Sequence, residues 1–297
     1  METSNQKPWH GIGVEVDANL SSREMLYKAK LDWEVSKIPS QRPKSYGNQE
    51  TIRFFKSFFE AAEADIETVG GLDSARILWG LAQFNEGFTL NGGDEVKGYI
   101  LLASRDEGRE KIEVQFLIMR ESCHNMVKIS SRAKPRIKNA FRRQFKPTFP
   151  FLNQNSQKFD DEMKKKVAGM ALMGREAISS FAVDAQLLAD KKINEAIAIQ
   201  FMFDIFQPEI TEDISLMKEE EWGPLADDKT KLAIEALSHA PGHELESANG
   251  TAWGLLNAVA YIVDHCLSTS QDSRLRQAWF GANAKLKKRA FELALAL

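Results

Sequence analysis

Cysteines and long apolar runs are scarce in this sequence of 297 residues. Only two cysteines occur, Cys123 and Cys266, which form no disulfide framework and fit a reducing compartment. No apolar run approaches the roughly 20 residues that span a bilayer, and residues 1–13 lack the apolar core of a signal peptide. We therefore expect a cytoplasmic protein without membrane contact.

Metal-binding motifs are also missing. Each cysteine has a histidine neighbour, His124 or His265, and the two pairs would supply four zinc ligands if they met in the fold. Adjacent residues point in different directions on a helix or strand, and there is no C-x-x-C or H-x-x-x-H spacing. Two small buried thiols beside polar caps are the favoured interpretation, so we predict no metal and no other cofactor.

Known catalytic motifs are absent as well. The sequence has no G-x-x-x-x-G-K-[ST] phosphate loop, no G-x-G-x-x-G after a strand and no G-x-S-x-G nucleophile elbow. The carboxylate pairs Asp160-Asp161 and Asp227-Asp228 fall at predicted helix starts, where the helix dipole explains them without a metal. These absences argue against ATP-driven chemistry and predict a protein that is not an enzyme.

Acidic residues are missing from one long stretch, residues 122–158, although the whole chain is acidic. The stretch carries nine positive charges in a chain of formal net charge −3, so the remaining residues sum to −12. Such an asymmetry points to a polyanionic partner, and nucleic acid is the first candidate. The alternative is a solvated surface helix whose charges pair with the acidic remainder. The basic residues are Lys128, Arg132, Lys134, Arg136, Lys138, Arg142, Arg143, Lys146 and Lys158.

Part of this stretch has helical periodicity. Pro135 suits the first turn of a helix, where its missing N–H costs nothing. Ile137, Phe141 and Phe145 then recur at helical spacing, with basic side chains on the opposite side. We predict a helix that packs by its apolar stripe and presents a basic face to phosphate. Phe141 and Phe145 are candidates for stacking on bases, but their place on the stripe favours the core.

The first half of the chain predicts a sheet preceded by two helices. Ser21 or Ser22 caps a short helix with Glu24 in its first turn, and residues 50–64 form an amphipathic helix. Strand-like runs follow at residues 76–84, 96–105 and 111–120, joined by turns that contain glycine. Short links predict an antiparallel meander, closed by a helix that starts at Ser122. The predicted fold class is α+β, an antiparallel β-β-β-α core sheet with a largely helical C-terminal half.

The second half is mostly helical. Residues 159–206 have helical periodicity throughout, an acidic linker follows, and two further helices at 251–265 and 273–297 close the chain. We expect a β-β-β-α nucleic-acid-binding core at residues 1–150. The helical region at residues 151–297 is expected to pack on this core and to mediate subunit contacts.

Several motifs, in chain order, resemble one known family. They are PWHGIG at residues 8–13, residues 67–72 followed by 76–81, the Cys-His-Asn-Met turn at 123–126, and GTAWGLLNAVAYIVDH at 250–265. With them the sequence resembles the family of phage/plasmid-like proteins, a domain of long-unknown function. Two features depart from that family: the segment around residues 38–49 is short, and a Cys-Asn-Asn-Thr-Leu turn has become Cys-His-Asn-Met.

The resemblance implies a function by analogy of fold. The β-β-β-α core and the phage setting are similar to the single-strand annealing proteins, the superfamily that includes RecT, Red-beta, Erf and the eukaryotic Rad-type annealases. Those proteins form rings or filaments, hold single-stranded DNA in a basic groove between sheet and helix, and pair it with its complement without ATP. The similarity implies single-stranded DNA and a homo-oligomer, ring or filament, as partners. A phage nuclease or a single-strand-binding protein is a further candidate partner.

We therefore predict ATP-independent binding and annealing of single-stranded DNA, as in phage-type recombination. The basic side chains of residues 122–146 would contact phosphate. Those at the hairpin between the second and third strands would extend the positively charged surface. The alternative for these hairpin residues is ordinary solvation in a turn. One alternative is a non-enzymatic phage or plasmid interaction protein, an anti-defence or assembly factor, that binds an acidic protein. Another is an undetected nuclease or other metal-dependent enzyme. The predicted DNA-binding residues are Lys128, Arg132, Lys134, Arg136, Lys138, Arg142, Arg143, Lys146, Arg105, Arg109 and Lys111.

Overall fold

The computed structural model of the chain describes residues 6–30, 48–74, 76–105, 111–129, 148–150, 161–268 and 270–297. Within these ranges an antiparallel sheet is packed between helices, and most helices belong to the C-terminal half. The predicted α+β fold class is therefore confirmed.

The strands follow one another through the sheet in chain order. The order is β1-β2-β3-β4-β5-β6, every neighbouring pair is antiparallel, and β7 pairs with β5 outside this path. The sheet is a meander, as predicted for its three long runs. Its strands are β1 (Gly13–Glu15), β2 (Asp65–Leu72), β3 (Ile77–Leu90), β4 (Asp94–Arg105), β5 (Lys111–Arg120), β6 (Met126–Lys128) and β7 (Thr148–Pro150).

β3 and β4 form a long hairpin with a tight turn. Gly92 and Gly93 in this turn have φ angles of +76° and +78°, which glycine adopts readily and L side chains do not. The turn places Leu90 opposite Asp94, and pairing continues along both strands with one irregularity. The strand predicted at residues 76–84 therefore extends further, to Leu90, because residues 87–90 also pair with β4.

The helices match much of the predicted periodicity. Ser21 caps α1 in a capping box: its Oγ accepts the Glu24 N–H at 3.3 Å, and the Glu24 carboxylate accepts the Ser21 N–H at 2.7 Å. The predicted C-terminal helix is two helices, because Gly281 has an extended backbone between them. The helices are α1 (Ser22–Lys28), α2 (Asn48–Ala61), α4 (Asp161–Asp190), α5 (Glu195–Phe206), α6 (Glu219–Trp222), α7 (Asp228–His239), α8 (Ala252–Tyr261), α9 (Gln271–Phe280) and α10 (Ala282–Ala296), with a short 3-10 helix η2 (Ile214–Leu216) and a short π-helix η3 (Ile262–Cys266).

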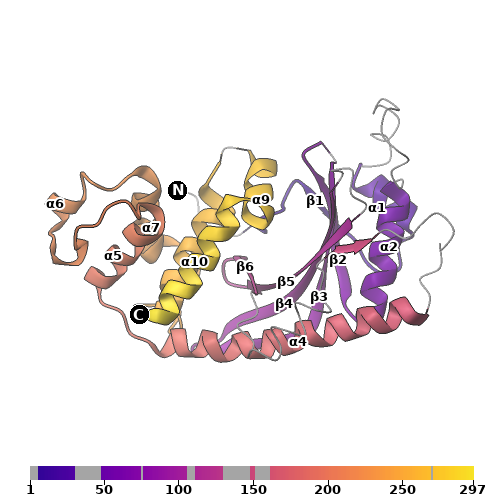
Figure 1. Ribbon diagram of the computed structural model, residues 1–297, viewed down its shortest axis with the longest axis horizontal. Helices are drawn as coiled ribbons and strands as arrows, with labels where there is room; N and C mark the ends of the chain where they lie inside the picture. Colours follow the sequence, from indigo (N-terminus) through magenta and orange to yellow (C-terminus); the bar gives the residue numbers. More distant parts are fainter. Residues whose placement is uncertain are drawn as a thin grey trace.

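Helices cover both faces of the sheet. Side chains alternate along β4, so Ile100 and Leu102 face a buried cluster with α1 and α2, whereas Leu101 and Ala103 face a second cluster with α8 and α10. Figure 1 shows these layers, with α2 on one side of the sheet and α9 and α10 on the other. None of the helices within the described ranges combines the length and apolar character needed to span a bilayer.

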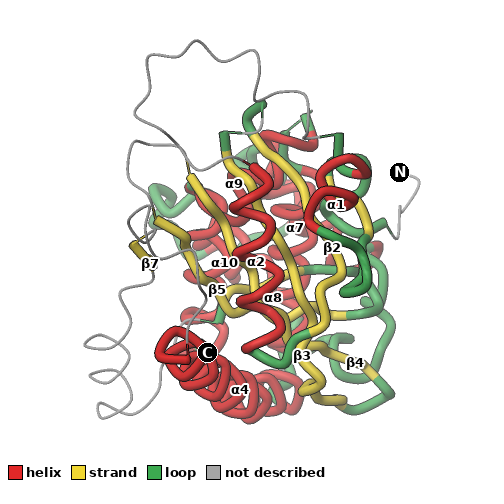
Figure 2. The backbone as a smooth tube through the Cα atoms, turned by 90° about the vertical axis from the view of Figure 1, so that its right-hand side faces the viewer, coloured by secondary structure: helices red, strands yellow, loops and turns green. Residues whose placement is uncertain are grey.

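The long helix α4 joins the two helical layers. It runs along the lower border of the molecule in Figure 1, and Figure 2 shows it nearly end-on. Val167 and Ile178 belong to the cluster with α2, whereas Phe181 and Leu188 belong to the cluster with α8 and α10. α4 is thus buried against both sides of the fold and fixes their relative position.

The prediction of a helix that starts at Ser122 is wrong for residues 122–129, the part of that stretch that the structure describes before β7. A turn with His124 in the left-handed region, φ +53°, leads instead into β6, which pairs with β5. The strand forms because Met126 and Val127 are buried when they extend the sheet. The helical stripe predicted after Pro135 lies outside the described residues.

Candidate functional site

β5 has one border that is covered by two separate short strands. β4 pairs along the opposite border of β5 over almost its whole length. On the remaining border, β7 pairs with residues 111–113 and β6 pairs with residues 117–119. Figure 2 shows β7 beside β5 at this side of the sheet. We call the border formed by β5, β6 and β7 the β5 edge.

The acid-free basic segment leaves and re-enters the sheet at the β5 edge. β6 ends at Lys128, and β7 begins at Thr148. The centres of the two pairings are about six residues apart on β5, or roughly 20 Å at about 3.3 Å per residue. Both ends of the segment are therefore fixed to one strand. The sequence between β6 and β7 has no acidic residue and includes Arg132, Lys134, Arg136, Lys138, Arg142, Arg143 and Lys146.

Three of the predicted DNA-binding residues lie within the described ranges. Lys111 begins β5, Lys128 ends β6 and Arg105 ends β4, so the structure brings Lys111 and Lys128 to the same edge. The Lys128 ammonium lies 3.7 Å from the Glu113 carboxylate, so one acidic side chain offsets its charge. Arg109 and the basic residues between β6 and β7 are outside the described residues.

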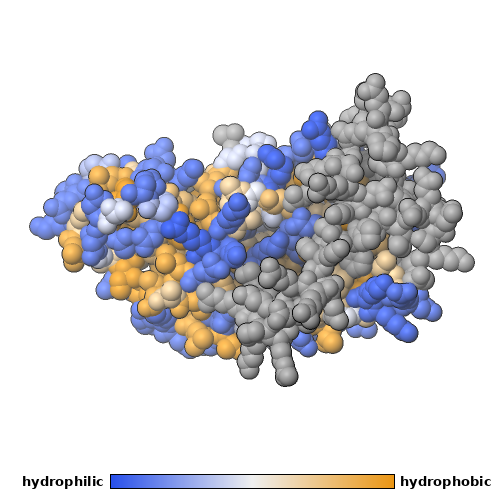
Figure 3. Space-filling model, viewed as in Figure 1, coloured by the Kyte–Doolittle hydropathy of each residue, from blue (hydrophilic) through white to orange (hydrophobic). Residues whose placement is uncertain are grey.

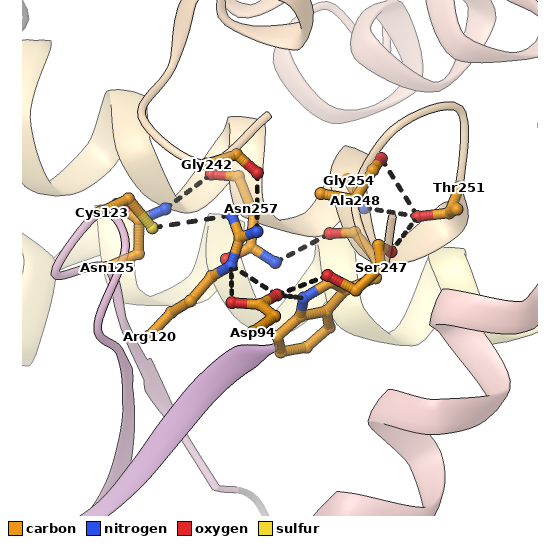
Figure 4. Close-up of polar contacts among 11 residues, drawn as sticks. Asp94, Arg120, Cys123, Asn125, Gly242, Ser247, Ala248, Thr251, Gly254 and Asn257 are labelled. Carbon is orange, nitrogen blue, oxygen red and sulfur yellow. Dashed lines mark hydrogen bonds and ion pairs between the residues drawn. The ribbon is translucent and has the colours of Figure 1, made fainter. Parts of the chain in front are cut away.

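A buried ion pair joins the sheet to the C-terminal helices. Asp94 and Arg120 are 0% and 2% exposed, and Arg120 Nε lies 2.7 and 2.8 Å from the two Asp94 oxygens. Asp94 also accepts hydrogen bonds from Ser247 Oγ at 2.6 Å and Trp253 Nε1 at 3.0 Å. Arg120 donates to the Gly242 carbonyl at 2.7 Å (Figure 4). We call these five residues the Asp94 clasp. The ion pair and these hydrogen bonds together offset the free-energy cost of removing both charges from water.

A second buried ion pair holds the turn between β5 and β6. Lys287 of α10 lies 2.7 Å from Asp264 of η3 and donates to the Met126 carbonyl at 2.6 Å. The Met126 N–H donates to Asp264 at 2.8 Å, and Asn125 Nδ2 donates to the Asn257 carbonyl of α8 at 3.0 Å. The turn that carries the Cys-His-Asn-Met motif is therefore locked against the C-terminal helices.

Other motif residues also hold the fold together. Thr251 caps α8, because its Oγ1 accepts the Gly254 N–H at 3.1 Å. Trp9, in the PWHGIG motif, packs against Trp279 with ring centroids 6.4 Å apart. Together with Trp253 in the Asp94 clasp, these residues contribute packing and capping.

The two cysteine–histidine pairs approach each other. The Cys123 backbone is hydrogen-bonded to the His265 ring, which packs on Tyr261 with centroids 5.1 Å apart. Burial lowers the pKa of His265 to about 4, so the ring is neutral at physiological pH. Burial also raises the pKa of the Cys123 thiol, although Arg120 opposes this. Over the described part of the chain, no three histidine, cysteine or acidic side chains are arranged to hold a metal ion.

A cavity of about 350 Å³ lies between α5, α7 and α8. Its lining includes apolar side chains, among them Ile199, Ile234 and Leu255, and the polar residues Arg120 and Asn125. The cavity therefore adjoins the Asp94 clasp and the β5–β6 turn, and it combines an apolar wall with buried polar groups.

The comparisons with known proteins give one result. The model of the family described as "Domain of unknown function (DUF932)" matches residues 37–279, a range that includes the sheet from β2 onward and the helices through most of α9. Comparison with the curated proteins gave no match, and neither did comparison with the solved structures. The similarity to single-strand annealing proteins therefore stays a prediction.

Proposed function

The chain belongs to the DUF932 family, whose name assigns no activity, and we propose that it binds single-stranded DNA and anneals it without ATP. One observation carries the proposal: both ends of the acid-free basic segment are fixed at the β5 edge. A concentrated positive charge favours nucleic acid, because each phosphate contact releases counterions from the DNA. β6 before this segment and β7 after it both pair with β5, so the chain leaves and re-enters the sheet at one border.

Single strands are favoured over duplex DNA by the order of the elements. Three long antiparallel strands, β3 to β5, precede the basic segment. These three strands are the part of the β-β-β-α order, expected for the annealing proteins that the sequence resembles, that lies within the described residues. The support is an analogy of fold, so the biochemical test must distinguish the two forms of DNA.

An exposed apolar face on α4 supports assembly into an oligomer. Leu172, Val183 and Leu187 are more than half exposed and recur at helical spacing, and Ile197 of α5 is also exposed. Figure 3 shows apolar surface at the lower left of this view, where α4 meets α5. Contacts between copies through this face would remove its apolar side chains from water.

A salt titration of DNA binding tests the proposal. We expect a labelled single-stranded oligonucleotide to bind tightly at low salt, because the binding is largely electrostatic. The logarithm of the binding constant should fall linearly with the logarithm of the salt concentration, with a slope of about −0.7 for each phosphate contact. Duplex DNA of the same length should bind more weakly.

Two outcomes would count against the proposal. Absence of binding at low salt would remove DNA as the partner, and so would an affinity that does not change with salt. Electron micrographs of the same mixture should show rings or filaments. An unchanged monomer in the presence of DNA would favour the alternative partner, an acidic protein, whose binding should persist in excess DNA.

A further inference from the structure

A buried hydrogen-bond acceptor lies at the cavity between α5, α7 and α8. Asn125 lines this cavity and is 1% exposed, and its Oδ1 has no hydrogen-bond partner within the described part of the chain. An unpaired buried acceptor costs about 1–3 kcal/mol, which is why such groups are rare and commonly have a role. The side chain is therefore a candidate contact for a bound molecule.

The orientation of the Asn125 amide is fixed from its other end. Its Nδ2 donates to the Asn257 carbonyl at 3.0 Å. A flipped amide would place Oδ1 against that carbonyl oxygen, where two acceptors would meet. Asn257 is itself held, because its Nδ2 donates to the Trp253 carbonyl at 2.9 Å. Figure 4 shows Asn125, Asn257 and Arg120 converging from three elements of the fold.

Arg120 supplies a donor on the same side of the cavity. Its Nε engages Asp94, and one terminal nitrogen donates to a backbone carbonyl. Within the described part of the chain, the hydrogen bond of the other terminal nitrogen, Nη1, goes to the Cys123 sulfur at 3.9 Å, and sulfur is a weak acceptor. The Arg120 N–H also donates to the Asn125 carbonyl at 3.1 Å, so the two side chains start from neighbouring backbone positions. Asp94 balances the guanidinium charge, which favours a neutral ligand.

We propose that this cavity binds a small neutral ring with a lactam edge, an N–H beside a C=O, of the kind that thymine, uracil and guanine present. The N–H would donate to Asn125 Oδ1, and the C=O would accept from Arg120. The ring would pack on Ile199, Ile234 and Leu255. A volume of about 350 Å³ accommodates a nucleoside, at the lower end of the range for small-molecule sites. The site lies at the opposite end of β5 from β7 and does not depend on the DNA-binding proposal.

Two matched nucleosides test this site on the full chain. We expect thymidine to bind saturably by calorimetry and to shift the side-chain amide NMR signals of Asn125 and Asn257. N3-methylthymidine lacks the donor, so it should bind about 10- to 100-fold more weakly. Equal binding of the two nucleosides, or no binding of thymidine or deoxyguanosine at millimolar concentration, would overturn the proposal and leave water as the partner of Asn125.

Two variants of α5 test whether thymidine binds in this cavity, and both leave Asn125 and Arg120 unchanged. Ala198 lines the cavity, so Ala198→Phe should fill it and abolish thymidine binding. Ala196→Phe on the same helix is the matched control, because Ala196 does not line the cavity. The triple variant Arg136→Glu/Arg142→Glu/Arg143→Glu should keep thymidine binding even though it loses DNA. Loss of thymidine binding in that variant, or its persistence in Ala198→Phe, would place the nucleoside elsewhere.

Discussion

Reversing three charges together, Arg136→Glu, Arg142→Glu and Arg143→Glu, is expected to weaken single-stranded DNA binding by about 100-fold or more at low salt. Each reversal removes an attraction to phosphate and adds a repulsion, and three such changes at about 1 kcal/mol each give an effect of this size. The salt dependence should also flatten, by about 2 in the logarithmic slope, because three phosphate contacts are lost. Fluorescence anisotropy titrations at several salt concentrations measure both quantities.

A variant with the same net charge provides the control. Lys192, Lys229 and Lys231 are exposed residues near α5 and α7, far along the chain from the β5 edge. Reversing these three charges should leave DNA affinity within about 3-fold, because the residues belong to the loop before α5 and to α7 rather than to the β5 edge, so no phosphate contact is lost. Circular dichroism should be unchanged in both variants. Equal losses of affinity in both would mean that overall charge, rather than the basic segment, governs binding.

Breaking the Asp94 clasp is expected to have the largest effect on stability. In Asp94→Asn the Arg120 charge stays buried without its counter-ion, which costs about 3–5 kcal/mol in comparable pairs. Ser247 and Trp253 also lose a charged acceptor for their hydrogen bonds. For a chain of this length we expect the melting temperature to fall by about 10 °C. Thermal and chemical denaturation measure the change.

An exposed ion pair on α4 is the comparison for this prediction. Lys166 and Glu162 lie 2.6 Å apart, but both side chains are well exposed. Glu162→Gln should therefore change the free energy of unfolding by less than about 0.5 kcal/mol. If Asp94→Asn were no more destabilising than Glu162→Gln, the sheet and the C-terminal helices would not depend on the clasp.

The sequence predicted those elements that are long enough to show a period. β3, β4 and β5 are strand-length apolar runs, and α2, α4 and α5 repeat apolar residues at helical spacing. β6 was missed because three residues show no period and its neighbours carry a charge pattern typical of a surface helix. α7 has a visible start, since Asp227 caps it by accepting the Thr230 N–H at 2.7 Å, but its polar composition resembles the linker before it.

The Asp94 clasp could not be predicted from local sequence patterns. Asp94 follows two turn glycines and resembles a solvated turn residue, whereas its partners Arg120, Ser247 and Trp253 lie 26, 153 and 159 positions away. Lys287 did carry a signal. It shares the buried stripe of α10 with Ala290 and Phe291, where a lysine needs a partner.

The candidate DNA site was predictable from the sequence only in part. Charge composition alone identifies the basic segment, and Lys128 is its first member. The return of the chain to β5 depends on a pairing between residues 148–150 and 111–113, two short runs far apart in the sequence. Short non-local strand pairs leave no periodic trace, so the attachment of both ends to one strand emerged only from the structure.

Photo-cross-linking of single-stranded DNA tests the central claim most directly. An oligonucleotide that contains 5-iodouracil is bound to the full chain and irradiated, and the cross-linked peptides are identified by mass spectrometry. We expect the cross-links to fall within residues 111–113 and 126–150, the β5 edge and the segment that starts and ends there. Thymidine is added in excess so that the cavity between α5, α7 and α8 is filled. Cross-links still concentrated in α5 to α7, or none from an oligonucleotide that is bound, would contradict the assignment of DNA to the β5 edge.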